Sequence, residues 1–155
     1  MEKVNQPILI AQKSKGYVAM MVASSLLLIL ALVFFSFLYQ GSLERVVQSI
    51  CFVLWIVFFV YNTFIILLPK NLIYATEKSF VIIGFGNKEQ IIPFDQIIEV
   101  RQRNTRARSI QYSFGSIIII TPNLRVRVSA IAEVDRVKSK MVELISTYKV
   151  KSASL

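Results

Sequence analysis

The chain has 155 residues, 55% of them hydrophobic, and a formal net charge of +9. This length allows one ordinary domain or a small domain with membrane anchors, and the composition is more apolar and more basic than that of an average soluble domain. There is no histidine, the usual general base and metal ligand, and the single cysteine, Cys51, excludes a disulfide within the chain.

Residues 1–16 are predicted to be a cytoplasmic tail that precedes a first membrane span. The span, Tyr17 to Tyr39, contains no charged residue. At 1.5 Å rise per residue it covers roughly 34 Å, enough to cross a hydrocarbon core of about 30 Å. It is too long for a signal peptide, and no small-residue cleavage site follows it at Gln40-Gly41. We therefore predict an uncleaved transmembrane helix.

A second apolar run, Ile50 to Leu68, is about 29 Å long as a helix and ends at Pro69-Lys70, a helix breaker followed by a charge. The short connector, residues 40–49, predicts an antiparallel transmembrane hairpin over residues 17–69. Neither span contains Asp, Glu, Lys or Arg, which disfavours a channel or proton relay. Asn62 is predicted to form a structural hydrogen bond with the neighbouring helix.

The distribution of basic residues predicts the orientation of the hairpin. The tail carries Lys3, Lys13 and Lys15, whereas the connector has only Arg45, which Glu44 balances. Fourteen basic residues follow Leu68. The positive-inside rule then predicts a multi-pass protein of the inner (cytoplasmic) membrane with both termini in the cytoplasm.

From residue 70 to 150 the pattern changes to short strands and one helix, which predicts a cytoplasmic domain followed by a short tail at 151–155. Alternation and turn residues mark the strands, and an apolar run such as Ile117–Ile120 predicts a strand covered on both faces. The predicted strands are 72–76, 79–84, 89–93, 97–103, 116–121 and 124–129, with a loop at 104–109.

The last part of this domain has the period of an amphipathic helix. Apolar residues recur at spacings of three and four, with acids near the start and lysines near the end, which suits the helix dipole. The stripe consists of Ile131, Val134, Val137, Met141, Leu144, Ile145 and Tyr148. The predicted fold is thus a transmembrane helical hairpin followed by a mainly antiparallel β domain, closed by a C-terminal amphipathic helix.

Four stretches of the β domain resemble the bacterial branch of the pleckstrin-homology (PH)-like fold. They are NLIYATEKSFVII (71–83), IIPFDQIIEVR (91–101), YSFGSIIIIT (112–121) and IAEVDRVKSKMVELI (131–145). The resemblance implies the fold more than the activity, because members of this group share no single function. Proteins of similar architecture include immunity factors against secreted peptides and photosystem assembly factors, and no motif here selects either role.

Enzymatic residues are not evident in the β domain. Its seven acids form no recognisable metal spacing and have no histidine partner, and Gly84-x-Gly86 reads as a hairpin turn because no helix follows it. We predict a protein that is not an enzyme and has no catalytic, cofactor-binding or metal-binding residues.

The candidate binding residues are six arginines on two strands and one loop. Beside a membrane, such residues attract anionic lipid head groups or an acidic partner. Alternating charge equally predicts an ordinary solvated strand face. The candidates are Arg101, Arg103, Arg106, Arg108, Arg125 and Arg127.

The predicted function is that of a membrane-anchored adaptor or protective protein, of immunity or assembly type, that binds a protein partner at the cytoplasmic face. The alternative is a module that binds anionic lipid through the arginines. Nucleic acid is a weaker third candidate, because the basic balance suits it but no helix-turn-helix, RNA-binding or zinc-finger motif is visible.

Overall fold

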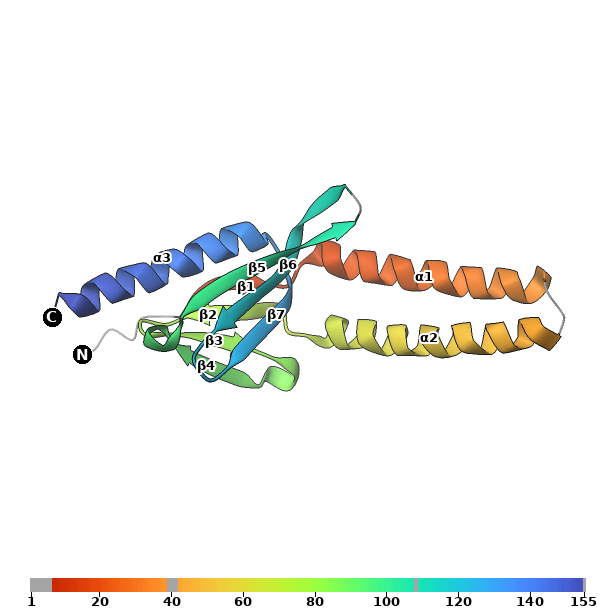
Figure 1. The fold of residues 1–155 in the computed structure, drawn as a ribbon, viewed down its shortest axis with the longest axis horizontal. Helices are drawn as coiled ribbons and strands as arrows, with labels where there is room; N and C mark the ends of the chain where they lie inside the picture. The colour runs from red at the N-terminus through yellow and green to blue at the C-terminus, as the bar shows by residue number, and fades with distance from the viewer. Residues whose placement is uncertain (1–6, 39–41, 108, 155) are drawn as a thin grey trace. The chain divides into compact units, whose positions relative to one another are not determined.

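The computed structural model describes residues 7–38, 42–107 and 109–154. The chain divides into two compact units, each considered by itself. A helical unit consists of residues 16–67, and a β unit combines residues 1–15 with residues 68–155. The elements of both units are labelled in Figure 1.

The helical unit contains α1 (Lys15–Leu38) and α2 (Ser42–Leu67). Both helices are long and apolar enough to cross a membrane. Only 6% of the most apolar stretch of α1 and 11% of that of α2 is buried. The predicted connector was wrong over residues 42–49, which belong to α2, because nothing in SLERVVQS breaks a helix. The remaining connector residues, 40 and 41, and Tyr39 lie outside the described residues.

Polar side chains in this unit bond either within one helix or between the two helices. The hydroxyls of Ser24 and Ser36 return to the carbonyls of Met21 and Leu32 in their own helix, each at 2.9 Å. The Asn62 amide Nδ2 of α2 instead donates to the Ser25 hydroxyl of α1, and both residues are buried. Asn62 therefore links the two helices, as predicted.

We expect Ser25→Ala to weaken the pairing of α1 with α2 by about 1 kcal/mol. The substitution leaves the Asn62 amide with only the Met21 carbonyl, 3.5 Å away. The free energy of unfolding of the full chain in mixed detergent micelles measures the effect. Ser24→Ala is the matched control, because the Ser24 hydroxyl bonds within its own helix. Equal losses in the two variants would contradict a role for the Ser25–Asn62 bond.

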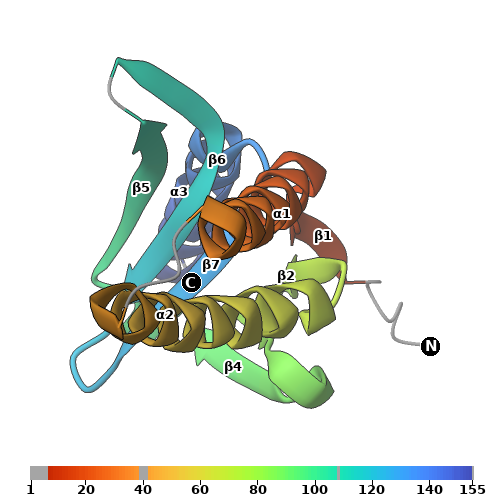
Figure 2. The same cartoon turned by 90° about the vertical axis from the view of Figure 1, so that its right-hand side faces the viewer.

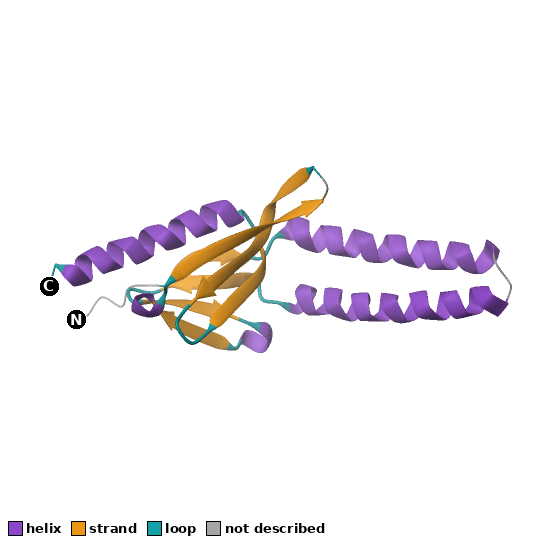
Figure 3. Cartoon of the chain, viewed as in Figure 1, coloured by secondary structure: helices purple, strands orange, loops and turns teal. Residues whose placement is uncertain are grey.

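The β unit contains two antiparallel sheets and one long helix (Figure 3). The first sheet has the order β1-β2-β3-β4, and the second has the order β5-β6-β7. The strands are β1 (Ile8–Gln12), β2 (Asn71–Ala75), β3 (Ser79–Ile83), β4 (Glu89–Pro93), β5 (Glu99–Ala107), β6 (Ile110–Ile120) and β7 (Arg125–Ile131). The helix α3 (Val134–Ala153) follows, and short 3-10 turns cover 85–87 and 94–96.

Strand β1 corrects the prediction that residues 1–16 are only a tail. Four of its five residues pair with β2, which follows the helical unit in the sequence. The apolar helices are thus inserted between the first two strands of the β unit rather than preceding the unit. Bulges in β1 place two consecutive residues, Ile10 and Ala11, in the core. Regular alternation is therefore missing, and the sequence pattern did not reveal the strand.

The core of the β unit lies between the sheets and α3. Phe94 contacts Phe80 and Tyr148 edge to face, with ring centroids 4.7 Å and 5.4 Å apart. Val134, Val137 and Met141 of α3 are buried in the same cluster, and Leu144, Ile145 and Tyr148 pack against it. This confirms the predicted stripe except for Ile131, which belongs to β7.

The β5–β6 hairpin is longer than predicted. The expected loop at 104–109 was wrong, because β5 continues to Ala107 and β6 begins at Ile110. The polar stretch NTRA resembles a loop in composition, but pairing with β6 keeps it extended. The prediction for the isoleucine run is confirmed for Ile117, Ile118 and Ile119, which are buried although they alternate between the two faces, whereas Ile120 is only half-buried.

Candidate functional site

The two chain segments that flank the helical unit are held together in the β unit. The backbone N–H of Lys13 donates to the Lys70 carbonyl at 2.8 Å. The Ser14 N–H donates to the Ala130 carbonyl at 2.7 Å, and the Ala132 N–H donates to the Gln12 carbonyl at 2.9 Å. We call these residues, together with Leu68, the linker clasp.

Lys13 contributes a second bond to the linker clasp through its side chain. Its ammonium Nζ donates to the carbonyl of Leu68, just after the end of α2. The last carbonyls of a helix lack partners within the helix and carry partial negative charge, so a lysine stabilises them. The chain therefore continues into α1 and returns from α2 at one end of the β unit, where the clasp holds both segments together.

Four of the predicted arginines share one face of the second sheet. Arg101 lies opposite Ile118, which lies opposite Arg127. Residues directly opposite each other in antiparallel strands project to the same face. Arg103 follows Arg101 by two positions on β5, and Arg125 precedes Arg127 by two on β7, so both project to this face. The opposite face carries Val100, Ile117, Ile119 and Val128 and forms the core.

The other two predicted arginines are not part of this face. Arg106 lies on β5 beyond a register irregularity that begins after Asn104, and it pairs with Gln111. Successive side chains of a strand project to opposite faces, and Arg106 is an odd number of residues away from Arg101 and Arg103. Arg106 therefore projects to the other face of the strand. Arg108 lies outside the described residues. The structure thus divides the six candidates, and we call Arg101, Arg103, Arg125 and Arg127 the arginine face.

One acid partly neutralises the arginine face. Glu99 is the only acidic residue in the second sheet, and its carboxylate lies 2.7 Å from the guanidinium of Arg101. The hydrogen bond from Arg101 lowers the pKa of Glu99, with further attraction from the charges of Arg101 and Lys138. The same bond raises the pKa of Arg101. In the described part of the chain, Arg103, Arg125 and Arg127 form no salt bridge, so they leave this surface basic.

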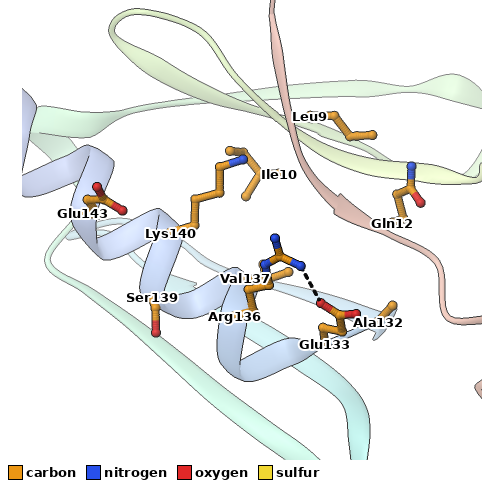
Figure 4. A pocket seen from close by; sticks show the side chains of 10 residues that line it. All are labelled: Leu9, Ile10, Gln12, Ala132, Glu133, Arg136, Val137, Ser139, Lys140 and Glu143. Atoms are coloured by element: carbon orange, nitrogen blue, oxygen red, sulfur yellow. Dashed lines mark hydrogen bonds and ion pairs between the residues drawn. The ribbon is translucent and has the colours of Figure 1, made fainter.

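An open groove of about 640 Å³ lies between β1 and α3, and the sequence did not predict it (Figure 4). Leu9, Ile10 and Gln12 line one wall, and Val137, Lys140 and Glu143 are among the residues of the other. Glu133 and Arg136 form a salt bridge at 3.2 Å at its edge. The apolar triplet Ile8-Leu9-Ile10 was the one available signal in the sequence, because such residues are unusual in a solvated tail.

Strand β1 is the first strand of its sheet, and its outer edge is bonded to residues 130–132 at Gln12 and just beyond. Among the described residues, no strand pairs with this edge at Leu9 and Ile10, which line the groove. The pairing of Lys13 with Ile131, just beyond the strand, is the one bridge described outside the sheets. Backbone groups on an open strand edge can pair with another extended chain. The groove therefore combines apolar residues, charged residues and the part of the β1 edge that no described strand pairs with.

Comparison of the chain with protein-family models, curated proteins and solved structures found no match. Among the described residues, no group of three or more His, Cys, Asp and Glu side chains is placed to hold a metal ion. The function is therefore inferred from the three surfaces described above: the linker clasp, the arginine face and the groove.

Proposed function

We propose that this protein is a membrane-anchored, non-enzymatic adaptor. In this proposal α1 and α2 cross the inner (cytoplasmic) membrane, and the β unit docks a protein partner at the cytoplasmic face. The pairing of β1 with β2 is the observation that carries the proposal. One strand precedes both helices and the other follows them, so both ends of the helical unit must lie on the same side of a bilayer that the helices cross.

The surface of the helices supports membrane insertion. Large apolar side chains on both helices are mostly exposed, including Leu27 at 67% and Leu54 at 63%. Continuous apolar surface of this extent is unfavourable in water and favourable in lipid. The lysines before α1 and the basic residues after α2 favour the cytoplasmic side for both termini.

The arrangement of the strands supports a PH-like relationship. Sheets of four and three antiparallel strands, followed by one closing helix, agree with the plan that the sequence stretches resemble. With β1 included, the strand count is seven. In this proposal the anchor is an insertion in the connection between the first two strands of such a domain.

The groove supports docking of an extended segment of a protein partner. Such a segment would add to the open edge of β1 as a further strand, with its side chains alternating between the groove floor and solvent. Two acids, Glu133 and Glu143, and two bases, Arg136 and Lys140, line the groove, so it suits a segment that carries charges of both signs. A partner held in this way stays next to the membrane, as an immunity or assembly role requires.

Site-specific photocrosslinking in native membranes tests the docking proposal. A benzophenone side chain at Leu9, in the groove, is expected to give one discrete crosslinked protein. The same probe at Ile91, on the opposite edge strand β4, is the matched control and should not give this product. Lys140→Trp, which fills the groove, should abolish the Leu9 product. Identical products at Leu9 and Ile91, or no product at Leu9, would contradict the proposal.

The arginine face supports a second candidate function, binding of anionic lipid. Its four arginines come from two strands that the register places side by side with β6. Each basic residue close to an anionic surface adds about 1 kcal/mol of attraction. This candidate requires that the face reach the head groups. Accordingly, Arg127→Gln should reduce the preference of the β unit for anionic nanodiscs.

A further inference from the structure

The β5–β6 hairpin extends beyond the rest of the second sheet. Strand β7 ends at Ile131, which lies opposite Gly115 of β6. The described residues 105–107 of β5 and 110–114 of β6 continue past this point, where Arg106 pairs with Gln111 and Ala107 with Ile110. Figure 2 shows this end of the β5–β6 hairpin extending past β7. We call this projection the arm. At about 3.4 Å per residue, its five β6 residues extend it by about 17 Å.

The arm projects from the end of the β unit that contains the linker clasp. Ile131 lies opposite Gly115, where the arm begins, and it also forms a bridge with Lys13 of the clasp. The arm therefore lies at the same end of the β unit as the two points where the chain continues into α1 and returns from α2. If α1 and α2 cross a bilayer, this end of the β unit faces that bilayer, because α1 begins at Lys15, two residues after the bonded Lys13.

The chemistry of the arm suits the boundary between lipid head groups and acyl chains. Arg106 is exposed, and Ile110 near the tip is 59% exposed although it is fully apolar. Tyr112 stacks on Phe114 with ring centroids 4.9 Å apart, which gives the arm an amphipathic aromatic ring on a rigid base. Aromatic rings of this kind prefer the membrane interface, and arginine pairs well with lipid phosphate.

The charge around the arm also suits an anionic membrane surface. No acidic residue occurs between Glu99 and Glu133 in the sequence. Glu99, the one acid of the second sheet, lies at the opposite end of β5 and is paired with Arg101, so the arm itself has no acid to repel phosphate groups. A polybasic segment close to the cytoplasmic leaflet gains attraction that decays within about 10 Å at ordinary salt, a distance within the reach of the arm.

We propose that the arm is a membrane-contacting element that places Ile110 and Tyr112 in the lipid interface and Arg106 against the phosphates of anionic lipids. The contact rests on the proposed membrane anchoring and adds to it a third attachment of the β unit, independent of the arginine face. It restricts rotation of the β unit about the linker clasp and so holds the groove in one orientation to the bilayer.

Fluorescence quenching by brominated lipids in nanodiscs tests this proposal with the full chain. Trp55 of α2 is the only tryptophan, so Trp55→Phe provides a background in which one new tryptophan reports its own depth. Ile110→Trp reports on the arm. Leu124→Trp is the matched control, since Leu124 is also exposed and lies in the turn at the other end of β6. We expect strong quenching and a blue-shifted emission at position 110 and neither at position 124.

The unmodified chain distinguishes failure of the arm from failure of the anchor. Quenching of Trp55 together with no quenching at position 110 would overturn the arm proposal and leave the anchoring intact. No quenching of Trp55 would overturn the anchoring and the arm proposal with it. Equal quenching at positions 110 and 124 would also overturn the arm proposal, because it would mean that the β unit has no preferred orientation. Cooperative thermal unfolding of each variant confirms that the β unit is folded.

A charge variant identifies the lipid chemistry. In the Ile110→Trp background, Arg106→Glu should reduce quenching in discs that contain phosphatidylglycerol and have little effect in discs of phosphatidylcholine alone. Arg127→Glu, on the arginine face, should leave the quenching at position 110 unchanged. The arm's proposed choice of anionic lipid would be wrong if Arg106→Glu had the same effect in both kinds of disc.

Discussion

Replacing Ala11 with aspartate should unfold the β unit while leaving α1 and α2 helical. Ala11 is 1% exposed and belongs to the core cluster, where it lies opposite Ile73 of β2. An unpaired carboxylate at this position must be desolvated or protonated, which we expect to cost about 3–5 kcal/mol. That is a large part of the 5–15 kcal/mol by which a domain is typically stable.

The measurement is chemical denaturation of the full chain in detergent micelles, followed by near-ultraviolet circular dichroism for the β unit and by helical signal for the helical unit. Ile8→Asp is the matched control, because Ile8 lies on the same strand but is 53% exposed. It should change the free energy of unfolding by less than about 0.5 kcal/mol. Equal stability of the two variants would mean that β1 is not part of the core. A fragment that begins at residue 70 lacks this strand and should show the same loss.

Replacing Gly115 with alanine should separate β5 from β6 at the base of the arm. A Cβ atom at this position would lie 2.2 Å from the carbonyl oxygen of Arg103 and 2.9 Å from the Cα of Asn104. Both are backbone atoms, so the conflict can be relieved only by moving one strand away from the other. We expect a loss of about 3 kcal/mol, typical of severe overpacking.

Hydrogen–deuterium exchange over residues 100–120 locates this effect, and denaturation gives its size. Gly84→Ala is the matched control, since its Cβ would meet only the Lys88 carbonyl at an ordinary 3.5 Å. In the Ile110→Trp background, Gly115→Ala should also weaken quenching by brominated lipids, because the arm loses its fixed direction. Unchanged exchange in the Gly115 variant would contradict the close approach of the two strands.

The proposed anchor, the arm and the groove together suggest how a small adaptor can act at a membrane. A tether raises the local concentration of the β unit at the bilayer, so weak contacts by the arm become effective. A fixed orientation then presents the groove to a partner in the same membrane. In this proposal the partner is selected by strand addition and charge at the groove, while the arm determines how the unit lies on the lipid.

Local patterns in the sequence determined a large part of this protein. The charge-free runs predicted both long apolar helices, because length and apolarity alone decide whether a helix can span a bilayer. Spacings of three and four predicted the buried stripe of α3, and alternation in RVRV and EVRQR predicted that Arg101 and Arg103 share one face. In each case the signal lies within one continuous stretch of the sequence.

Only the tertiary structure decided what depends on pairing between distant residues. Strand β1 has five residues and irregular alternation, so its place in the sheet is set by β2, which lies beyond the whole helical unit. The linker clasp and the groove both depend on that pairing. So does the position of the arm at the same end of the β unit as the clasp. The extension of β5 to Ala107, which places Arg106 on a strand and not in a loop, follows from pairing with β6. Strand partners and registers are non-local, so no period in the sequence encodes them.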